Sequence, residues 1–342
     1  MMTNTKRNNT LDVARGLAII LVVLGHIIQH NLAGNSCSLI FKVVYSFHMP
    51  LFFLLSGYVS AYNKEIHSLS DLGDNVCKKT VQLYVPYLTF GLILPLILQK
   101  KEWGDCISVI TNPQNGPWFL ATLWMTQLIF MTVNYGKSLI LKSKNNLSFN
   151  IIVEAGVYLS GLVIIMAGNR LTDGSSYFSV LYYVMFVLGR YCASYKELAF
   201  HPLVVLGSLL VFAILIPFYM QFDGNKMILV LFQLAVSLCM SISILSFCKE
   251  ASSSTHFFSK RFAIIGRYSL HIYLLDYAFI VYAKECGIID VTLLKPAWLF
   301  LLIFVIAYLV CELMILLSSI MEKNKYLNFL LFGKRFWLSI HL

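Results

Sequence analysis

Charged residues are scarce in this chain of 342 residues, of which Asp, Glu, Lys and Arg together make up 12%. A soluble globular protein is about one quarter charged and about half apolar. Here 58% of the residues are hydrophobic and the mean hydropathy is +0.75. The apolar residues come in blocks of about 20, enough for a helix to cross a hydrocarbon core about 30 Å thick. This composition excludes an ordinary soluble domain and predicts a membrane protein.

Strict alternation of polar and apolar residues is also missing, although every strand of a membrane β-barrel requires it. The α-helix is the other structure that satisfies all backbone hydrogen bonds within a membrane. We therefore predict an all-α, polytopic integral membrane protein with about ten transmembrane helices, forming a single domain over residues 1–342. The predicted spans are 11–29, 39–62, 80–99, 118–141, 149–168, 176–195, 202–220, 226–248, 263–284 and 294–320, followed by a cytoplasmic tail, 321–342.

Metal-binding and nucleotide-binding motifs are absent as well. The eight cysteines show no paired spacing such as C-x-x-C, and the histidines have no close ligand partners, so we expect no metal. No glycine-rich phosphate loop is present. No internal repeat with matching broken helices is visible, which disfavours an inverted-repeat transporter.

Lysine and arginine indicate the orientation, because the cytoplasmic loops of membrane proteins carry an excess of both. With a cytoplasmic N-terminus, 18 of the 26 lie on the inner side, seven on the outer side, and Arg15 within the first span. We therefore expect both termini in the cytoplasm. The net charge of +10 follows from this bias and from attraction to membrane lipids, so it does not call for a nucleic acid partner.

A stripe of ionisable groups follows the first predicted span, where RGLAIILVVLGH begins at Arg15 and ends at His26. A separation of eleven residues returns to within about 20° of the starting direction on a helix. Asp12 lies three residues before Arg15 and can pair with it on the same face. Ionisable groups at this depth usually face a protein interior or a water-filled cavity, so the stripe is a candidate site. The structural alternative is a packing histidine and an arginine that reaches the inner membrane surface.

The distance along the helix limits what this stripe can do. Eleven residues separate Arg15 from His26 by roughly 16 Å, so the two side chains cannot act on one atom. They can serve the two ends of a long ligand that has a charged end near the cytoplasm and a reacting end deeper in the membrane. An acyl-coenzyme A fits this description, because its pantetheine arm separates the phosphates from the thioester.

At these residues the chain resembles a known family. The stretch LDVARGLAIILVVLGH resembles the opening of the membrane acyltransferase family three proteins, whose signature is an arginine, ten residues and a histidine in the first helix. The segment YSFHMPLFFLLSGY is similar to the second helix of the family, and its His-Met-Pro form resembles the fucose 4-O-acetylase branch. Later stretches that resemble family landmarks are KKTVQLYVPYL, GPWFLATLW, FVLGRY and IGRYSLHIYLLDY.

The resemblance implies an inner-membrane O-acetyltransferase of bacteria. Such an enzyme takes an acetyl group from cytoplasmic acetyl-CoA and passes it to a hydroxyl of a surface polysaccharide, such as an O-antigen or capsule, or of its lipid-linked precursor. We predict His26 as the general base, because a neutral imidazole can accept the proton of a sugar hydroxyl. An acyl-histidine intermediate is the alternative. Arg15 is expected to hold the donor, with Asp12 fixing its orientation.

The chain departs from the family at two places. Lys78 and Lys79 stand where family members often carry arginines at the entry of the third helix, and we predict that they contact the coenzyme A phosphates. Lysine lacks the bidentate fork of arginine, and the positive-inside bias alone would also place lysines there. Asp276 stands where the family commonly has histidine, so no role is carried over to it. Asp276 and His271 remain pocket candidates only.

Three further residues are candidates for binding the acceptor, each with a structural alternative. His48 precedes Pro50, whose kink can aim an imidazole into a cavity, or the histidine can form a hydrogen bond that holds the kink. Tyr58 lies in a Ser-Gly-Tyr segment that also indicates close helix packing. Trp118 can stack on a sugar or belong to the aromatic belt at the outer interface.

Two other functions stay open from the sequence. A transporter or flippase of a lipid-linked glycan would use the polar stripe to line a path, and an assembly partner would need no chemistry. The concentration of intramembrane charge in the first helix favours the enzyme. The acyl group is also open, since a succinyl or longer donor fits the same residues. The sequence does not indicate the oligomeric state.

Overall fold

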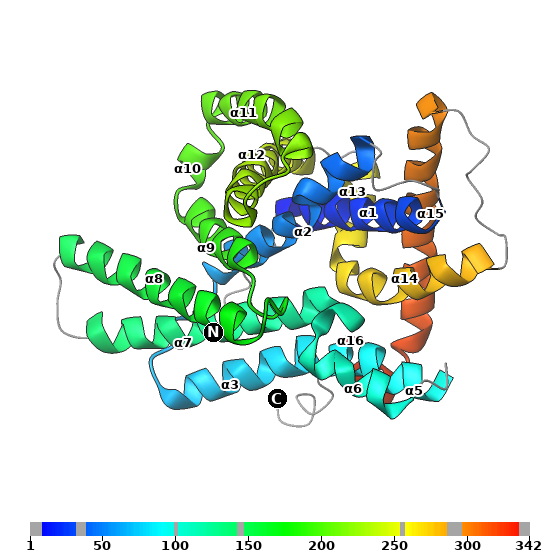
Figure 1. Ribbon diagram of the computed structural model, residues 1–342, viewed down its shortest axis with the longest axis horizontal. Coiled ribbons are helices and arrows are strands. Elements are labelled where there is room, and N and C mark those ends of the chain that lie inside the picture. The colour runs from blue at the N-terminus through cyan, green and yellow to red at the C-terminus, as the bar shows by residue number, and fades with distance from the viewer. Residues whose placement is uncertain are drawn as a thin grey trace. The chain divides into compact units, whose positions relative to one another are not determined.

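The computed structural model describes residues 9–31, 39–98, 102–141, 147–253, 257–285 and 296–334, and all secondary structure within these ranges is helical (Figure 1). The described residues of each of the ten predicted spans are largely helical. Seven helices of the described residues are long and apolar enough to cross a membrane. Two shorter apolar helices cover Val180–Ser194 and Ser269–Ile280. The prediction of an all-α, polytopic membrane protein is therefore confirmed, while the number of spans and their direction stay predictions.

The chain forms two compact units, each built from segments distant in the sequence. Unit 1 comprises Met1–Ser56 and Tyr191–Ile320, and unit 2 comprises Gly57–Arg190 and Met321–Leu342. Helices α2 (Leu39–Ser60), α9 (Val180–Ser194) and α15 (Pro296–Met321) contribute residues to both units. Unit 1 also contains α1 (Asn9–Asn31), α10 (Lys196–Ala199), α11 (Pro202–Gln221), α12 (Lys226–Ser253), α13 (Phe257–Arg267) and α14 (Ser269–Glu285).

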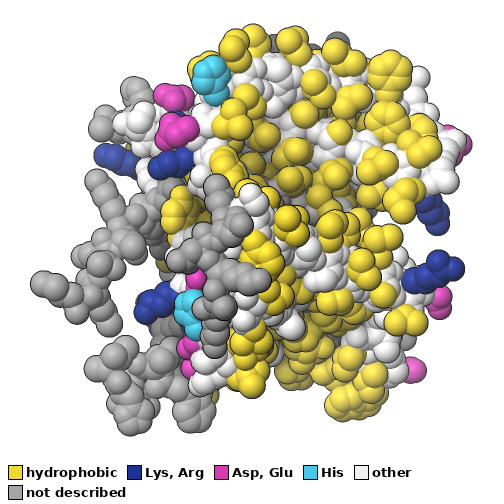
Figure 2. Space-filling model, turned by 90° about the vertical axis from the view of Figure 1, so that its left-hand side faces the viewer, with side chains coloured by type: hydrophobic (Ala, Val, Ile, Leu, Met, Phe, Trp, Pro, Cys, Tyr) yellow, Lys and Arg dark blue, Asp and Glu magenta, His cyan; other side chains and the backbone are white. Residues whose placement is uncertain are grey.

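Helix α1 is the core of unit 1. In its apolar window, 78% of the residues are buried, compared with 6% in α11. A helix that is hydrophobic on all sides and enclosed by neighbours belongs to the interior, and α12, α13 and α14 pack against α1. By contrast α11 contacts α12 and leaves large apolar side chains exposed. Apolar side chains are spread over much of the face shown in Figure 2, as expected for a surface in contact with lipid.

The backbones of α1 and α13 touch at two glycines. A Cβ atom on Gly16 would overlap the carbonyl oxygen of Phe262, and one on Gly266 would overlap the carbonyl oxygen of Asp12. Small residues at a helix crossing allow this close approach within a membrane. Gly16 follows Arg15 in the first motif, so the same short stretch provides both a candidate site residue and the packing that positions it.

We expect Gly16→Ala to destabilise the protein by about 3 kcal/mol or to prevent folding, because a methyl group there meets backbone that cannot turn aside. Gly207→Ala on α11 is the matched control, since nothing lies within 4 Å of a Cβ at that position. That change is expected to be neutral or to stabilise by up to about 1 kcal/mol. The measurement is thermal unfolding of both variants in detergent, and equal stability would contradict the close crossing.

Helix α2 accommodates a proline in its interior. Pro50 has no N–H, so the carbonyl of Ser46, four residues earlier, loses its partner within the helix. The hydroxyl of Ser237 in α12 donates to this carbonyl at 2.7 Å. The freed backbone group is thus satisfied by a neighbouring helix, which ties α2 to α12 within unit 1.

The predicted ninth span, 263–284, is divided between two helices. Helix α13 ends at Arg267 and α14 begins at Ser269, with Tyr268 between them. Gly266 and Ser269 flank this break, and Gly/Ser pairs are a recognised cause of sharp bends. Because of this break, α13 packs against the first half of α1, while α14 packs against the second half of α1 with a different set of residues.

Unit 2 contains the third predicted span, 80–99, whose described residues belong to a longer helical run. The helical run begins with α3 (Leu69–Lys79), which Ser68 caps, and continues through α4 (Val85–Leu88) and α5 (Leu94–Leu98). Two π segments interrupt it, at Thr80–Tyr84 and Thr89–Ile93. Each is followed two residues later by a proline, Pro86 or Pro95, whose ring cannot fit an ordinary turn. The helical run begins at Leu69, eleven residues before the predicted membrane span, because the capping box at Ser68 fixes its start. The bounds of the span itself stay a prediction.

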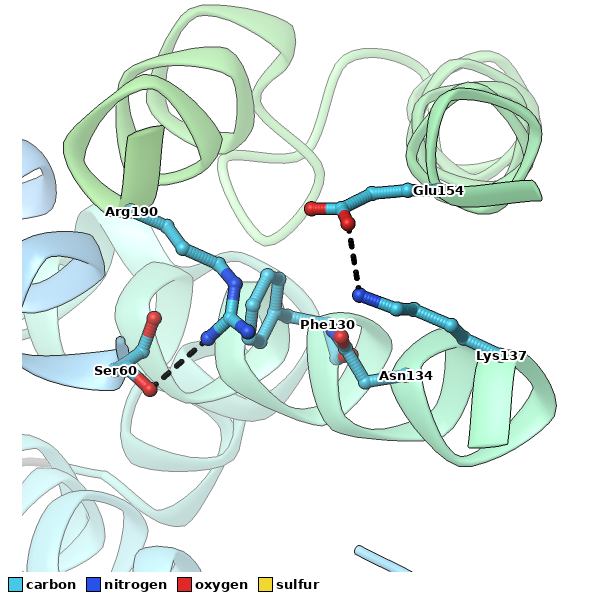
Figure 3. Close-up of polar contacts among 6 residues, drawn as sticks. All are labelled: Ser60, Phe130, Asn134, Lys137, Glu154 and Arg190. Atoms are coloured by element: carbon cyan, nitrogen blue, oxygen red, sulfur yellow. Dashed lines mark hydrogen bonds and ion pairs between the residues drawn. The ribbon is translucent and has the colours of Figure 1, made fainter. Parts of the chain in front are cut away.

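The remaining helices of unit 2 are α6 (Trp103–Thr111), α7 (Trp118–Leu141), α8 (Leu147–Leu171) and α16 (Lys325–Phe332). Polar contacts join several of them (Figure 3). Arg190 of α9 donates from Nη1 to the carbonyl of Ser60 at 3.1 Å, and its guanidinium lies over the ring of Phe130. Lys137 of α7 pairs with Glu154 of α8 at 2.9 Å. Arg190 thus binds a carbonyl at the C-terminus of α2, where the helix itself leaves carbonyls without partners.

Part of the predicted cytoplasmic tail packs on unit 2. Helix α16 contacts α4 and both π segments, and its Leu331 and Phe332 are buried. Gly333 ends the helix with a positive φ of 63°, and a Cβ there would overlap the carbonyl oxygen of Val81. This part of the tail is therefore packed on the protein. The rest of the tail, 335–342, lies outside the described residues.

Candidate active site

His26 forms its strongest contact with a residue 250 positions away. Its Nδ1 lies 2.8 Å from Oδ2 of Asp276, which is fully buried in α14. A carboxylate accepts hydrogen bonds, so the Nδ1–H donates to it, and Nε2 of a neutral imidazole keeps its lone pair. The His26 side chain is 17% exposed, so it has access to a ligand. A carboxylate behind an imidazole, with the opposite nitrogen free to accept a proton, is the arrangement of a general base.

Asp276 is the site residue that the sequence analysis left without a role. It was kept only as a pocket candidate together with His271, which is buried and meets the ring of Tyr268 edge-on. A lone aspartate within the apolar stretch HIYLLDYAFI was the available signal, because a buried carboxylate in a membrane helix needs a partner. Sequence spacing could not identify that partner on another helix.

A second group of charges lies near the start of α1. Oδ1 of Asp12 is 3.8 Å from Nη1 of Arg15, the pairing that the spacing predicts, and its Oδ2 is 3.8 Å from Nε of Arg267. Asp12 is buried, whereas both arginines are partly exposed. Two guanidinium groups share one carboxylate, so this cluster carries a net positive charge. Arg267 was missed as a site residue, although it follows Gly266 in the IGRY stretch.

The face of α1 between these two groups is covered by protein. Because α1 is continuous from Asn9 to Asn31, Arg15 and His26 lie on one side of it, roughly 16 Å apart along the axis. Ile19 and Val22, which lie between them, are both buried. A ligand that contacts both ends must therefore pass over neighbouring helices rather than along bare α1.

His48 lies in unit 1 but is turned toward its own helix. It is buried, and Nδ1 lies 2.8 Å from the carbonyl of Val44, to which it donates. This is the backbone hydrogen bond that the structural alternative for His48 expected beside Pro50. Its ring also lies 4.6 Å from that of Tyr45, measured between centroids.

The other predicted site residues belong to unit 2. Lys78 and Lys79 end α3, just before the first π segment, rather than opening a helix. Tyr58 is buried beside Gly57, where a Cβ would overlap the carbonyl oxygen of Phe186 in α9, so close packing is present in this segment. Trp118 begins α7 and stacks on Tyr182 with 5.6 Å between the ring centroids.

Metal ligands do not gather in the part of the chain that the structure describes, where no three His, Cys, Asp or Glu side chains could hold an ion. The sequence also allows a disulfide among Cys37, Cys106 and Cys286, which fall in or near the predicted outer loops, or small apolar residues beside the membrane helices. Cys37 and Cys286 lie outside the described residues, as does the side chain of Cys106.

The fold and the site together define a class: a polytopic helical membrane protein whose first helix holds a cationic cluster near one end and a carboxylate-backed histidine near the other. The chain belongs to acyltransferase family three, whose model, described as an acyltransferase domain, matches residues 8–316. The family recognised from the motifs of the first two helices is thereby confirmed.

Two curated relatives match parts of the chain. Nodulation protein NolL of Sinorhizobium fredii (strain NBRC 101917 / NGR234) is 39% identical over 90 residues, which are 24% of this chain and 23% of that protein. Nodulation protein NolL of Mesorhizobium japonicum (strain LMG 29417 / CECT 9101 / MAFF 303099) is 27% identical over 161 residues, 44% of this chain and 40% of that protein. The matches thus span less than half of each relative. No solved structure matches the chain.

Proposed function

We propose that this protein is an O-acetyltransferase of the bacterial inner membrane. It moves an acetyl group from cytoplasmic acetyl-CoA to a sugar hydroxyl of a surface polysaccharide or of its lipid-linked precursor. The His26–Asp276 pair is the observation that carries the proposal, because it gives a membrane-embedded imidazole the tautomer that a general base needs. Membership of an acyltransferase family supports the transfer of an acyl group.

The chemistry follows from the two nitrogens of His26. Nε2 accepts the proton of the sugar hydroxyl while the hydroxyl oxygen attacks the thioester carbonyl. Asp276 stabilises the imidazolium that forms, because its carboxylate lies against Nδ1–H. The C–S bond then breaks, the thiolate of coenzyme A leaves and takes up the proton from Nε2, and the acetyl ester remains on the sugar. His26 is thereby returned to its neutral form.

The cationic cluster near the start of α1 suits the charged end of the donor. Arg15 and Arg267 present guanidinium groups that bind phosphates bidentately, and Asp12 holds both of them while cancelling only one of the two charges. In the predicted orientation this cluster lies toward the cytoplasm, where acetyl-CoA is made, and His26 lies in the outer half. Lys78 and Lys79 are proposed to contribute further phosphate contacts.

The proposal is tested by deleting the gene and comparing the surface polysaccharide of the two strains by NMR. We expect the O-acetyl signals of one sugar position to disappear in the deletion strain and to return when the gene is supplied again. Complementation with His67→Ala, an exposed histidine, should restore them as well. Identical ester signals in the parent and deletion strains would refute glycan modification, and loss of a succinyl or longer ester would replace acetyl by that group.

A further inference from the structure

An exposed tyrosine lies directly beside the proposed base. The ring of Tyr277 in α14 meets His26 edge-on with 5.6 Å between centroids, and meets His30 in the same way at 5.1 Å. Both histidines belong to α1 and are four residues apart, so they contact the Tyr277 ring from the same face of that helix. Tyr277 itself is 51% exposed, so about half of it is available to a ligand.

A second aromatic group continues this surface from α2. Gly25 makes room for it, because a Cβ there would lie 2.8 Å from Cε2 of Tyr45. Tyr45 therefore rests against α1 next to His26, and its hydroxyl donates to Oε1 of Gln29 at 2.9 Å. That bond uses the carbonyl oxygen of the exposed Gln29 amide, whereas the two N–H donors of the amide take no part in it.

The chemistry of this surface differs from that of a lipid-facing one. The imidazoles of His26 and His30 and the amide of Gln29 lie within about one turn of α1, and the rings of Tyr277 and Tyr45 contact this turn from α14 and α2. Ionisable groups in a membrane protein usually face a cavity or a ligand. A pyranose ring presents an apolar C–H face and a rim of hydroxyls. An exposed aromatic face beside amide donors complements both parts, since aromatic rings combine apolar area with polar edges.

Resting on the proposed function, we propose that Tyr277 and Gln29 form the binding subsite for the acceptor sugar. The C–H face of the sugar stacks on Tyr277, and the amide N–H groups of Gln29 donate to a ring hydroxyl. In this position another hydroxyl of the same sugar reaches Nε2 of His26. The subsite determines the affinity for the acceptor and leaves the binding of acetyl-CoA unchanged.

The test uses the full-length protein in detergent, radiolabelled acetyl-CoA, and surface polysaccharide of the deletion strain that has been freed of esters by alkali. Tyr277→Ala is expected to raise the KM for the polysaccharide about tenfold, with the KM for acetyl-CoA unchanged. Tyr277→Leu, which keeps the bulk of the side chain, should show the same rise, and Tyr277→Phe should stay within twofold of wild type. Gln29→Ala is expected to raise the acceptor KM about threefold.

Tyr282→Ala is the matched control, because Tyr282 is 62% exposed and lies on the same helix about 140° further round. It should leave both KM values unchanged. An acceptor KM that is the same in wild type, Tyr277→Ala and Tyr277→Leu would overturn the subsite, as would a loss confined to kcat. Failure of the wild-type protein to label both this polysaccharide and its lipid-linked precursor would instead refute the proposed function, so the two failures are distinguishable.

Discussion

Replacement of His26 by alanine is expected to lower the rate of acetyl transfer at least about 10³-fold. General base catalysis contributes about 10²- to 10⁴-fold, and no other described side chain holds an imidazole nitrogen against the buried carboxylate of Asp276. The measurement is incorporation of radiolabelled acetyl groups by purified protein in detergent. His26→Gln, which keeps a polar side chain of similar length, should be equally inactive, because an amide cannot accept the proton.

The loss must be separated from a loss of folding. His67→Ala provides the matched control, since His67 is exposed in the segment between α2 and α3 and should retain full activity. All three variants are expected to elute from size exclusion as the wild-type protein does. A His26→Ala protein that acetylates at more than one tenth of the wild-type rate would exclude His26 as the base.

Asp276→Asn is expected to lower kcat about 10²- to 10³-fold and to leave the KM for acetyl-CoA unchanged. The amide is neutral and cannot stabilise an imidazolium, and its N–H groups can donate to Nδ1 and leave the proton on Nε2, the wrong nitrogen. The size of the side chain is preserved, so the packing of α14 against α1 should persist. The measurement is the steady-state rate over a range of donor concentrations.

A double-mutant cycle shows whether the two residues act as one unit. If Asp276 works only through His26, then His26→Ala combined with Asp276→Asn should be no slower than His26→Ala alone. Asp223→Asn, in the segment between α11 and α12, is the matched control and should behave as wild type. Additive losses would mean that Asp276 contacts substrate independently or maintains the fold.

The features that could be predicted from the sequence are those that local geometry determines. Arg15 and His26 share a face because eleven residues make slightly more than three helical turns, and Asp12 pairs with Arg15 because three residues return to the same side. The close packing at Gly57 was likewise visible as a cluster of small residues. Each of these predictions needs only the geometry of a single helix in an apolar environment, and the composition of the chain already predicts membrane helices.

The features that could not be predicted from the sequence depend on contacts between distant segments. Nothing in the sequence around His26 indicates that Asp276 lies against it, or that Arg267 joins Asp12, because both partners are brought there by the packing of α13 and α14. The helical run that contains the third predicted span begins earlier than the apolar block indicated, for a different reason. Its first eleven residues are polar enough to resemble a loop, yet the capping box at Ser68 and the contacts of the helix outweigh their composition.

The glycine crossing of α1 and α13 has a consequence for donor selection. Because the two backbones are in contact at Gly16 and Gly266, α1 and α13 cannot slide past each other. The distance from the guanidinium groups of the cationic cluster to the imidazole of His26 is therefore fixed. In the function that we propose, coenzyme A binds with its phosphates on those guanidinium groups, so the length of its pantetheine arm would have to match this distance for the thioester to reach His26. In that arrangement, the volume that the helices leave on the far side of the His26 imidazole would limit the size of the acyl group.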